Sequence, residues 1–163
     1  MNVKKIKLSF VFLCVLVLLS ACGRKNISVK VNGIAMRPTF DDGNTVAVST
    51  QFSPLERGDI VAINFDRFDS KDNISSEIII KRIIALEGDE IDIVSDGVFV
   101  NGVSLNEPYI NEPTTDLGNI AYPLVVPSGY VFVMGDNRKF SMDSRFDRLG
   151  CIAIDNILGK VVL

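Results

Sequence analysis

The stretch from Ile78 to Leu86 constrains the fold most, because it is a run of apolar residues interrupted only by Lys81 and Arg82. Successive residues of a β-strand point to opposite faces of the sheet, and both faces of this stretch carry isoleucine. A strand that is apolar on both faces has to be covered on both. The sequence therefore predicts a central strand with Lys81 on the face of Ile79 and Ile83, and with Arg82 on the opposite face.

The remainder of the chain after its first 26 residues consists of short apolar runs separated by turn-forming residues. No long stretch has the period of an amphipathic helix, and Gly, Pro, Asn and Asp recur between the runs. We expect strands at residues 27–31, 45–49, 60–65, 90–94, 97–100, 130–134, 151–154 and 159–163, and loops at 66–77 and 106–127. The predicted fold class is all-β, a small domain of coiled antiparallel sheets.

Composition removes several classes of function. Histidine is absent from the 163 residues, which excludes Ser-His and Cys-His catalysis and histidine metal sites. The segment before Cys22 holds three of the 17 basic residues and no acidic one, so 14 basic residues face 20 acidic ones in the remainder, a balance of −6. This charge disfavours a nucleic-acid partner. Of the three cysteines, Cys151 is expected to pack in the core, and we expect neither a disulfide nor a metal or cofactor.

Residues 1–21 are organised like a secretory signal. Three lysines precede an apolar run from Leu8 to Leu19, which is shorter than the about 20 residues that a membrane span requires. The run ends in Leu19-Ser20-Ala21-Cys22, which resembles the bacterial lipobox, where the cysteine becomes lipid-modified and is the first mature residue. We expect residues 1–21 to be a lipoprotein signal peptide and Cys22 to tether residues 22–163 to the outer face of the membrane. An uncleaved membrane anchor is the alternative.

Lys81 is a candidate general base. A lysine accepts a proton from a serine hydroxyl only when it is neutral, and burial among apolar residues favours the neutral form. The neighbouring isoleucines provide such surroundings. The alternative is a lysine whose amine reaches solvent while its methylenes cover the strand.

Three segments resemble, in order and spacing, the sequence boxes of bacterial type I signal peptidases, the S26 family of Ser-Lys endopeptidases. They are Asn32 to Phe40 (NGIAMRPTF), Lys81 to Asp89 (KRIIALEGD) and Met134 to Arg145 (MGDNRKFSMDSR). The resemblance extends from about Ile27 to Leu163. It implies the small signal-peptidase-type β fold and an enzyme that removes signal peptides from exported preproteins at the extracytoplasmic face of a bacterial membrane.

The resemblance also implies a role for each matching residue. Lys81 matches the general base, Ser141 the hydroxyl that orients the lysine amine, Asp143 and Arg145 a supporting charged pair, Met36 a substrate-binding residue, and Gly33 with the backbone N–H of residue 35 the oxyanion contacts. Two such donors stabilise a tetrahedral intermediate by several kcal/mol.

The nucleophile is the exception, because the family's catalytic serine falls on Ala35. A methyl group cannot attack a carbonyl, and the nearby hydroxyls of Ser28 and Thr39 do not occupy the aligned position. One interpretation is therefore a signal peptidase that is impaired or inactive as written. A second is a pseudopeptidase lipoprotein that binds signal peptides or assists an active signal peptidase. A third is a lipoprotein scaffold for surface assembly.

Overall fold

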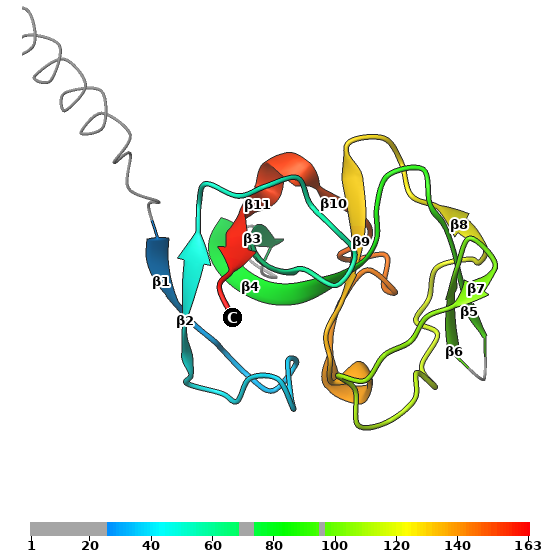
Figure 1. The fold of residues 1–163 in the computed structure, drawn as a ribbon, viewed down its shortest axis with the longest axis horizontal. Helices are drawn as coiled ribbons and strands as arrows, with labels where there is room; N and C mark the ends of the chain where they lie inside the picture. The colour runs from blue at the N-terminus through cyan, green and yellow to red at the C-terminus, as the bar shows by residue number, and fades with distance from the viewer. Residues whose placement is uncertain (1–25, 69–73, 95–96) are drawn as a thin grey trace, which may run out of the picture.

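The computed structural model describes residues 26–68, 74–94 and 97–163, and within them the chain is almost entirely β (Figure 1). The leader and Cys22, with the predictions made for them, lie outside the described residues. The strands are β1 (Asn26–Lys30), β2 (Thr45–Ser49), β3 (Ile60–Phe68), β4 (Ile74–Ala85), β5 (Glu90–Val94), β6 (Gly97–Val100), β7 (Val103–Ser104), β8 (Leu124–Val125), β9 (Tyr130–Met134), β10 (Ile152–Ala153) and β11 (Ile157–Val161). Two 3₁₀ helices are η1 (Arg138–Phe140) and η2 (Ile154–Asn156).

Two antiparallel sheets organise these strands. The larger has the order β1-β2-β11-β3-β4-β9-β10, and the smaller has the order β7-β6-β5-β8. The smaller sheet lies at the opposite side of the molecule from β1 and β2, with β9 between them (Figure 1). The fold class predicted from the sequence is thereby confirmed.

Alternating burial explains the local strand formation. In β5, Ile91 and Ile93 are buried while Glu90 is exposed, which is the period of a strand with one face on the core. In β4, Ile80 belongs to one buried cluster and Ile83 to another, so both faces of this strand are covered as predicted. Its central place in the larger sheet, between β3 and β9, follows from that coverage.

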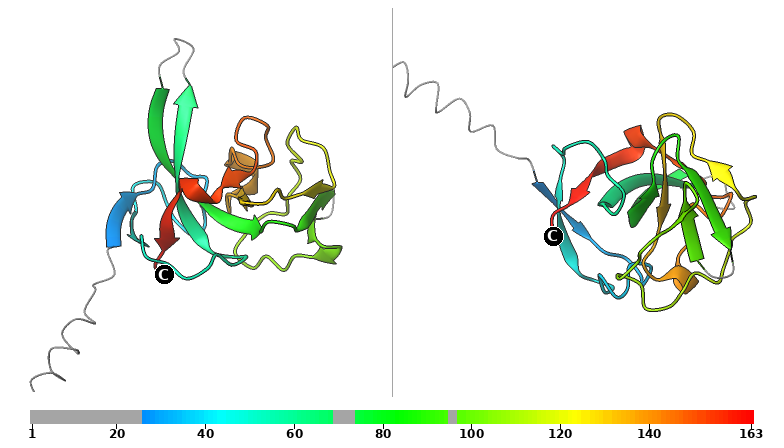
Figure 2. Two further views of the ribbon diagram at one scale, coloured as in Figure 1. Left: turned by 90° about the horizontal axis from the view of Figure 1, so that it is seen from above. Right: turned by 45° about the vertical axis from the view of Figure 1, so that its right-hand side comes forward.

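The prediction of a loop over residues 66–77 is wrong at both ends of that range. β3 continues to Phe68 and β4 begins at Ile74, with Phe65 paired to Glu77 and Phe68 paired to Ile74. These two strands extend away from the rest of the molecule as a hairpin (Figure 2). Residues 66–77 are mostly polar and charged, so the hydrophobic pattern does not reveal these strand segments.

Smaller differences concern the chain's end and the long loop. The last two predicted strands are observed as β10 and β11, separated by η2, and β8 lies within the segment predicted to be loop. Cys151 is half-buried against the cluster that includes Phe132 and Met134, in agreement with a packing role, and burial raises the pKa of its thiol. None of the helices in the described ranges is long and apolar enough to cross a membrane.

Gly159 provides a test of the larger sheet. A Cβ at this position would lie 2.3 Å from the Ser49 carbonyl oxygen and 2.7 Å from Val48 Cγ1, so Gly159→Ala forces β11 away from β2. We expect a loss of unfolding free energy of about 1–3 kcal/mol, measured by urea denaturation. Thr45→Ala, at an exposed position of β2, is the control and should change stability by less than about 0.5 kcal/mol. Equal stability of the two variants would contradict the observed packing.

Candidate functional site

The register between β4 and β9 assembles the site. Arg82 of β4 pairs with Met134, the last residue of β9. Because Gly135 and Asp136 follow Met134 directly, the chain leaves β9 beside the segment that carries Lys81. Two of the three sequence boxes are therefore adjacent in space although Asp89, the last residue of one, lies 45 positions before Met134, the first residue of the other.

Asp136 joins the third box to the other two. Its carboxylate accepts hydrogen bonds from Arg82 Nε at 2.8 Å and from Arg82 Nη2 at 2.6 Å, and the two side chains are buried. The Thr39 hydroxyl donates to the same carboxylate at 2.5 Å. Arg82 also donates to the Gly58 carbonyl and stacks 3.9 Å from the centroid of the Tyr109 ring. The Thr39 hydroxyl therefore donates to the same carboxylate that is ion-paired with Arg82.

Asn137 fixes the loop that carries Ala35. The Asn137 backbone N–H donates to the Ala35 carbonyl oxygen at 3.0 Å, and its side-chain amide donates to the Ile34 carbonyl oxygen at 3.1 Å. The loop also closes on itself, because the Phe40 N–H donates to the Met36 carbonyl. All of these contacts use backbone oxygens of the loop, so none depends on the side chain at position 35.

Lys81 is buried, with only 5% of its surface exposed, as the strand pattern predicts. Burial lowers the pKa of its amine below the ordinary lysine value. The negative charge of Asp143 opposes that effect, and the positive charge of Arg145 adds to it. Of the two interpretations offered for this lysine, its burial agrees with an amine enclosed by the protein rather than one that reaches solvent, and its role as the general base stays a prediction.

Ser141 lies next to the Ala35 loop. A Cβ placed on Gly135 would be 2.3 Å from Ser141 Oγ and 2.5 Å from the Ala35 carbonyl oxygen, so both atoms border the same point. Gly135 is required here because any side chain would separate them. Ser141 Oγ is buried and has no hydrogen-bond partner among the described residues, so its predicted role in orienting Lys81 stays a prediction.

Asp143 and Arg145 form the supporting ion pair that was predicted, and both are fully buried. Arg145 Nε donates to Asp143 Oδ1 at 2.8 Å, and Asp143 Oδ2 accepts the N–H of Gly135 at 3.0 Å. Arg145 Nη2 donates to the carbonyls of Arg138 and Ser141. The pair thus fixes the turn that carries Ser141 and the glycine that contacts it.

One of the two predicted oxyanion donors already has a hydrogen-bond partner in the structure. The N–H of Gly33 donates to Asp42 Oδ1 at 2.7 Å, so a substrate oxygen would have to replace that carboxylate. Gly33 has a φ of +80°, a conformation that glycine adopts without strain. No observation tests the role of either donor, and both stay predictions.

A small cavity lies between Ala35 and Lys81. It has a volume of about 40 Å³ and is bordered by Met36, Ile78 and Ile80 as well. The space matches a side chain of only a few atoms, since one water takes about 30 Å³ of liquid volume. No group of three His, Cys, Asp or Glu side chains able to hold a metal occurs in the described part of the chain.

Comparison with known proteins identifies the class. The family model described as "Signal peptidase, peptidase S26" matches residues 3–163. The chain therefore belongs to the S26 signal peptidase family.

Particular relatives agree with this assignment. The chain is 36% identical over 139 residues to signal peptidase I of Bacillus amyloliquefaciens, covering 79% of this chain and 68% of that protein. It is 36% identical over 149 residues to signal peptidase I V of Bacillus subtilis, covering 83% of each. A crystal structure of a signal peptidase I from Enterococcus faecalis aligns with a TM-score of 0.55 and 30% identity, over 69% of this chain and 100% of that one.

Three residues important to the geometry were not singled out from the sequence, namely Gly135, Asp136 and Asn137. They belong to a segment whose resemblance to the family was noted, and the density of polar residues after a clear strand was the available signal. The pattern does not show which partners Asp136 and Asn137 would find, because Arg82 lies 54 positions from Asp136 and Ile34 lies 103 positions from Asn137.

Lys81 makes stability depend on pH in a defined direction. Its pKa is lowered in the folded protein, whereas in the unfolded chain it is about 10.4. Between these values the unfolded chain binds more protons, so unfolding free energy rises with pH. We expect Lys81→Met to be more stable than the unsubstituted chain at pH about 7, by about 1.4 kcal/mol for each pKa unit separating the two states, with the advantage shrinking toward pH about 10.

Urea denaturation at several pH values measures this difference. Lys30→Met makes the same substitution at an exposed position of β1 and is the matched control for the loss of a lysine side chain. A pH-independent difference for Lys81→Met would mean that the amine is protonated equally easily in both states.

Proposed function

We propose that this chain binds the signal peptides of exported preproteins at the cavity between Ala35 and Lys81, and that it does not cleave them by the Ser-Lys mechanism. The proposal rests mainly on the methyl group at position 35. Hydrogen bonds hold the backbone of the loop that carries it, and Lys81 is buried, so the site lacks only the nucleophile. Family membership supplies the class of substrate.

The chemistry of the missing step explains the second half of the proposal. In a Ser-Lys peptidase the serine oxygen attacks the scissile carbonyl and gives its proton to the neutral lysine, which later protonates the leaving amine. Lys81 retains the burial that this step needs. With Ala35 no oxygen is present to form the acyl-enzyme, so covalent catalysis is lost while the binding surface is retained.

The size of the cavity supports a signal-peptide ligand. Signal peptides end in small residues of the A-x-A type. A cavity of about 40 Å³ has room only for a small side chain, and isoleucines and Met36 border it together with the polar residues Asn32, Glu77 and Lys81. A chain that binds such peptides without cutting them holds a preprotein at the membrane surface or presents it to an active signal peptidase. A scaffold for surface assembly has no specific observation in its favour.

Substitution of Ala35 by serine tests the proposal. The chain as written should bind a synthetic signal-peptide substrate without releasing product, and Ala35→Ser should cleave it at least about 10³-fold faster, because the serine restores the missing nucleophile. Product release is measured by chromatography, and binding by fluorescence anisotropy of a labelled peptide.

Two controls sharpen this experiment. Ala35→Ser combined with Lys81→Met should bind the peptide but remain inactive, which assigns the gain to the Ser-Lys pair. Cleavage by the unsubstituted chain at the rate of Ala35→Ser would refute the loss of catalysis. Absence of peptide binding by every variant would refute the proposed substrate class.

We also propose that Cys22 is lipid-modified and anchors the domain at the extracytoplasmic face of a bacterial membrane. The basis is the sequence of the leader, in which Leu19-Ser20-Ala21 precedes the cysteine. Several acyl chains on one residue give stable membrane attachment, whereas a single chain is marginal. Mass spectrometry of the mature N-terminus should show acylated Cys22, and Cys22→Ser should abolish processing. An intact, unmodified Met1 terminus would identify an uncleaved anchor instead.

A further inference from the structure

A buried ion pair connects the segment that follows β7 to the segment that follows β9. The Glu107 carboxylate accepts hydrogen bonds from both terminal nitrogens of Arg138, with Nη1 at 2.8 Å. The Arg138 side chain is 1% exposed and the Glu107 side chain is 7% exposed, so the pair is shielded from solvent. Pro108 follows Glu107 directly and restricts its backbone to extended conformations. A carboxylate that binds a guanidinium through both oxygens holds it in one orientation.

Glu107 is also linked to Arg82 of the central strand. Its carboxylate accepts a hydrogen bond from the Tyr109 hydroxyl at 3.0 Å. The Tyr109 ring lies 3.9 Å from the guanidinium carbon of Arg82, a separation at which the ring attracts a cation. Burial and the negative charge of Glu107 raise the pKa of the Tyr109 hydroxyl, so this group remains a proton donor to the carboxylate at neutral pH.

The two arginines fix the residues on either side of Asn137. Arg82 is ion-paired with Asp136, the residue before Asn137, and Arg138 is the residue after it. Asn137 itself donates hydrogen bonds from its backbone N–H and its side-chain amide to carbonyl oxygens of the Ala35 loop. The direction in which Asn137 points therefore depends on both of its neighbours, and one of them is held by Glu107.

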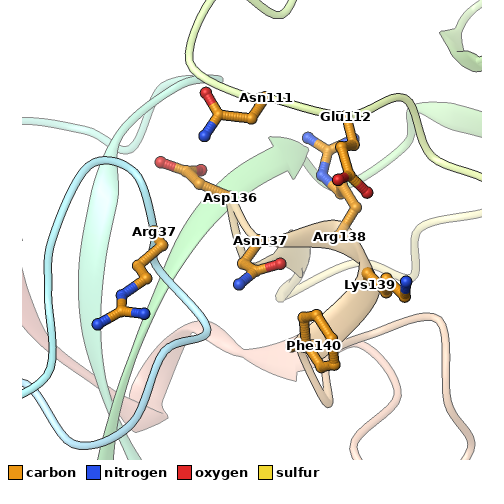
Figure 3. A pocket seen from close by; sticks show the side chains of 8 residues that line it. All are labelled: Arg37, Asn111, Glu112, Asp136, Asn137, Arg138, Lys139 and Phe140. Atoms are coloured by element: carbon orange, nitrogen blue, oxygen red, sulfur yellow. The ribbon is translucent and has the colours of Figure 1, made fainter.

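The segment after β7 does not pack against the segment after β9 along its whole length. A cavity of about 220 Å³ is bordered by Asn111 and Glu112 on one side and by the residues from Asp136 to Phe140 on the other (Figure 3). Open space thus separates the two segments at this point. The polar contacts of Arg138 with Glu107 and with the Thr114 hydroxyl, at 2.6 Å, carry the connection instead.

We propose that Glu107 is a positioning residue of the site, which holds Arg138 and, through Arg138 and Asn137, keeps the Ala35 loop in place. Glu107 is not among the described residues that border the small cavity between Ala35 and Lys81, so it acts through other residues. Loss of its carboxylate leaves the buried Arg138 cation uncompensated. Asn137 then no longer has one fixed direction, and the loop loses its two hydrogen bonds part of the time. This inference goes beyond the proposed function, because it concerns how the site is held and not what happens to the peptide.

Amide hydrogen exchange tests the inference on the full chain as written. Glu107→Gln is nearly isosteric but removes the charge that Arg138 faces. The Asn137 N–H, which donates to the Ala35 carbonyl oxygen, should exchange at least about tenfold faster in this variant, because the loop opens more often. The exchange rate is measured by NMR spectroscopy of the ¹⁵N-labelled chain.

Val126 provides an internal reference and Glu112 a matched control. Val126 is buried and its N–H donates to the Asp89 carbonyl oxygen, so faster exchange there reports unfolding of the domain as a whole. Glu107→Gln should accelerate the Asn137 amide about tenfold more than the Val126 amide. Glu112→Gln makes the same change at an exposed position of the same segment and should alter neither rate.

Cleavage in the Ala35→Ser background supplies a second readout, and this part of the test rests on the proposed function. Adding Glu107→Gln should lower kcat about tenfold or more while KM changes less than about twofold, because a serine displaced from Lys81 reacts slowly although the peptide still binds. Circular dichroism has to show that the variant is fully folded at the temperature of the assay.

Tyr109→Phe keeps the experiment decisive if Glu107→Gln does not fold. It retains the ring beside Arg82 and removes only the hydroxyl that donates to Glu107. The Asn137 amide should exchange about threefold faster in this variant, with the Val126 amide unchanged.

The outcomes separate a positioning role from a merely structural one. Equal acceleration of the Asn137 and Val126 amides would overturn the inference, since Glu107 would then only stabilise the fold. Unchanged exchange at Asn137 would overturn it as well. If Ala35→Ser cleaves no peptide, the proposed function loses support, and the exchange rates still decide the role of Glu107.

Discussion

The buried ion pair between Arg82 and Asp136 is the interaction on which the site depends. It connects the central strand β4 to the segment after β9, and the Thr39 hydroxyl brings the Ala35 loop to the same carboxylate. Removing one partner of a buried pair typically costs about 3–5 kcal/mol, because the other charge is left uncompensated. Here such a loss would also break the contacts that connect the three family-like segments to one another. Arg82 and Asp136 are therefore needed both for the stability of the fold and for the arrangement of the site.

Most of the fold could be predicted because its strands either alternate apolar and polar residues or are apolar on both faces. Ile78 to Leu86 was recognised as a central strand, and the burial of Lys81 followed from it. The hairpin beyond Phe65 was missed because residues 66–77 are mostly polar and carry no alternating apolar pattern. The site was only partly predictable. The strand pattern predicts the burial of Lys81, and the family resemblance pointed to Asp143 and Arg145, which the structure shows as a buried ion pair. The hydrogen bonds of Asn137 to the Ala35 loop depend on long-range pairing that no local pattern encodes.

The way in which Asn137 holds the Ala35 loop has a consequence for how such a protein changes over time. The loop is fastened through the carbonyl oxygens of Ile34 and Ala35, and these atoms are the same whatever side chain position 35 carries. The fold consequently does not select between alanine and serine there. Loss or recovery of the hydroxyl is a one-residue step that leaves the surrounding architecture undisturbed, so a lineage can pass between cutting and holding its ligand without first rebuilding the domain.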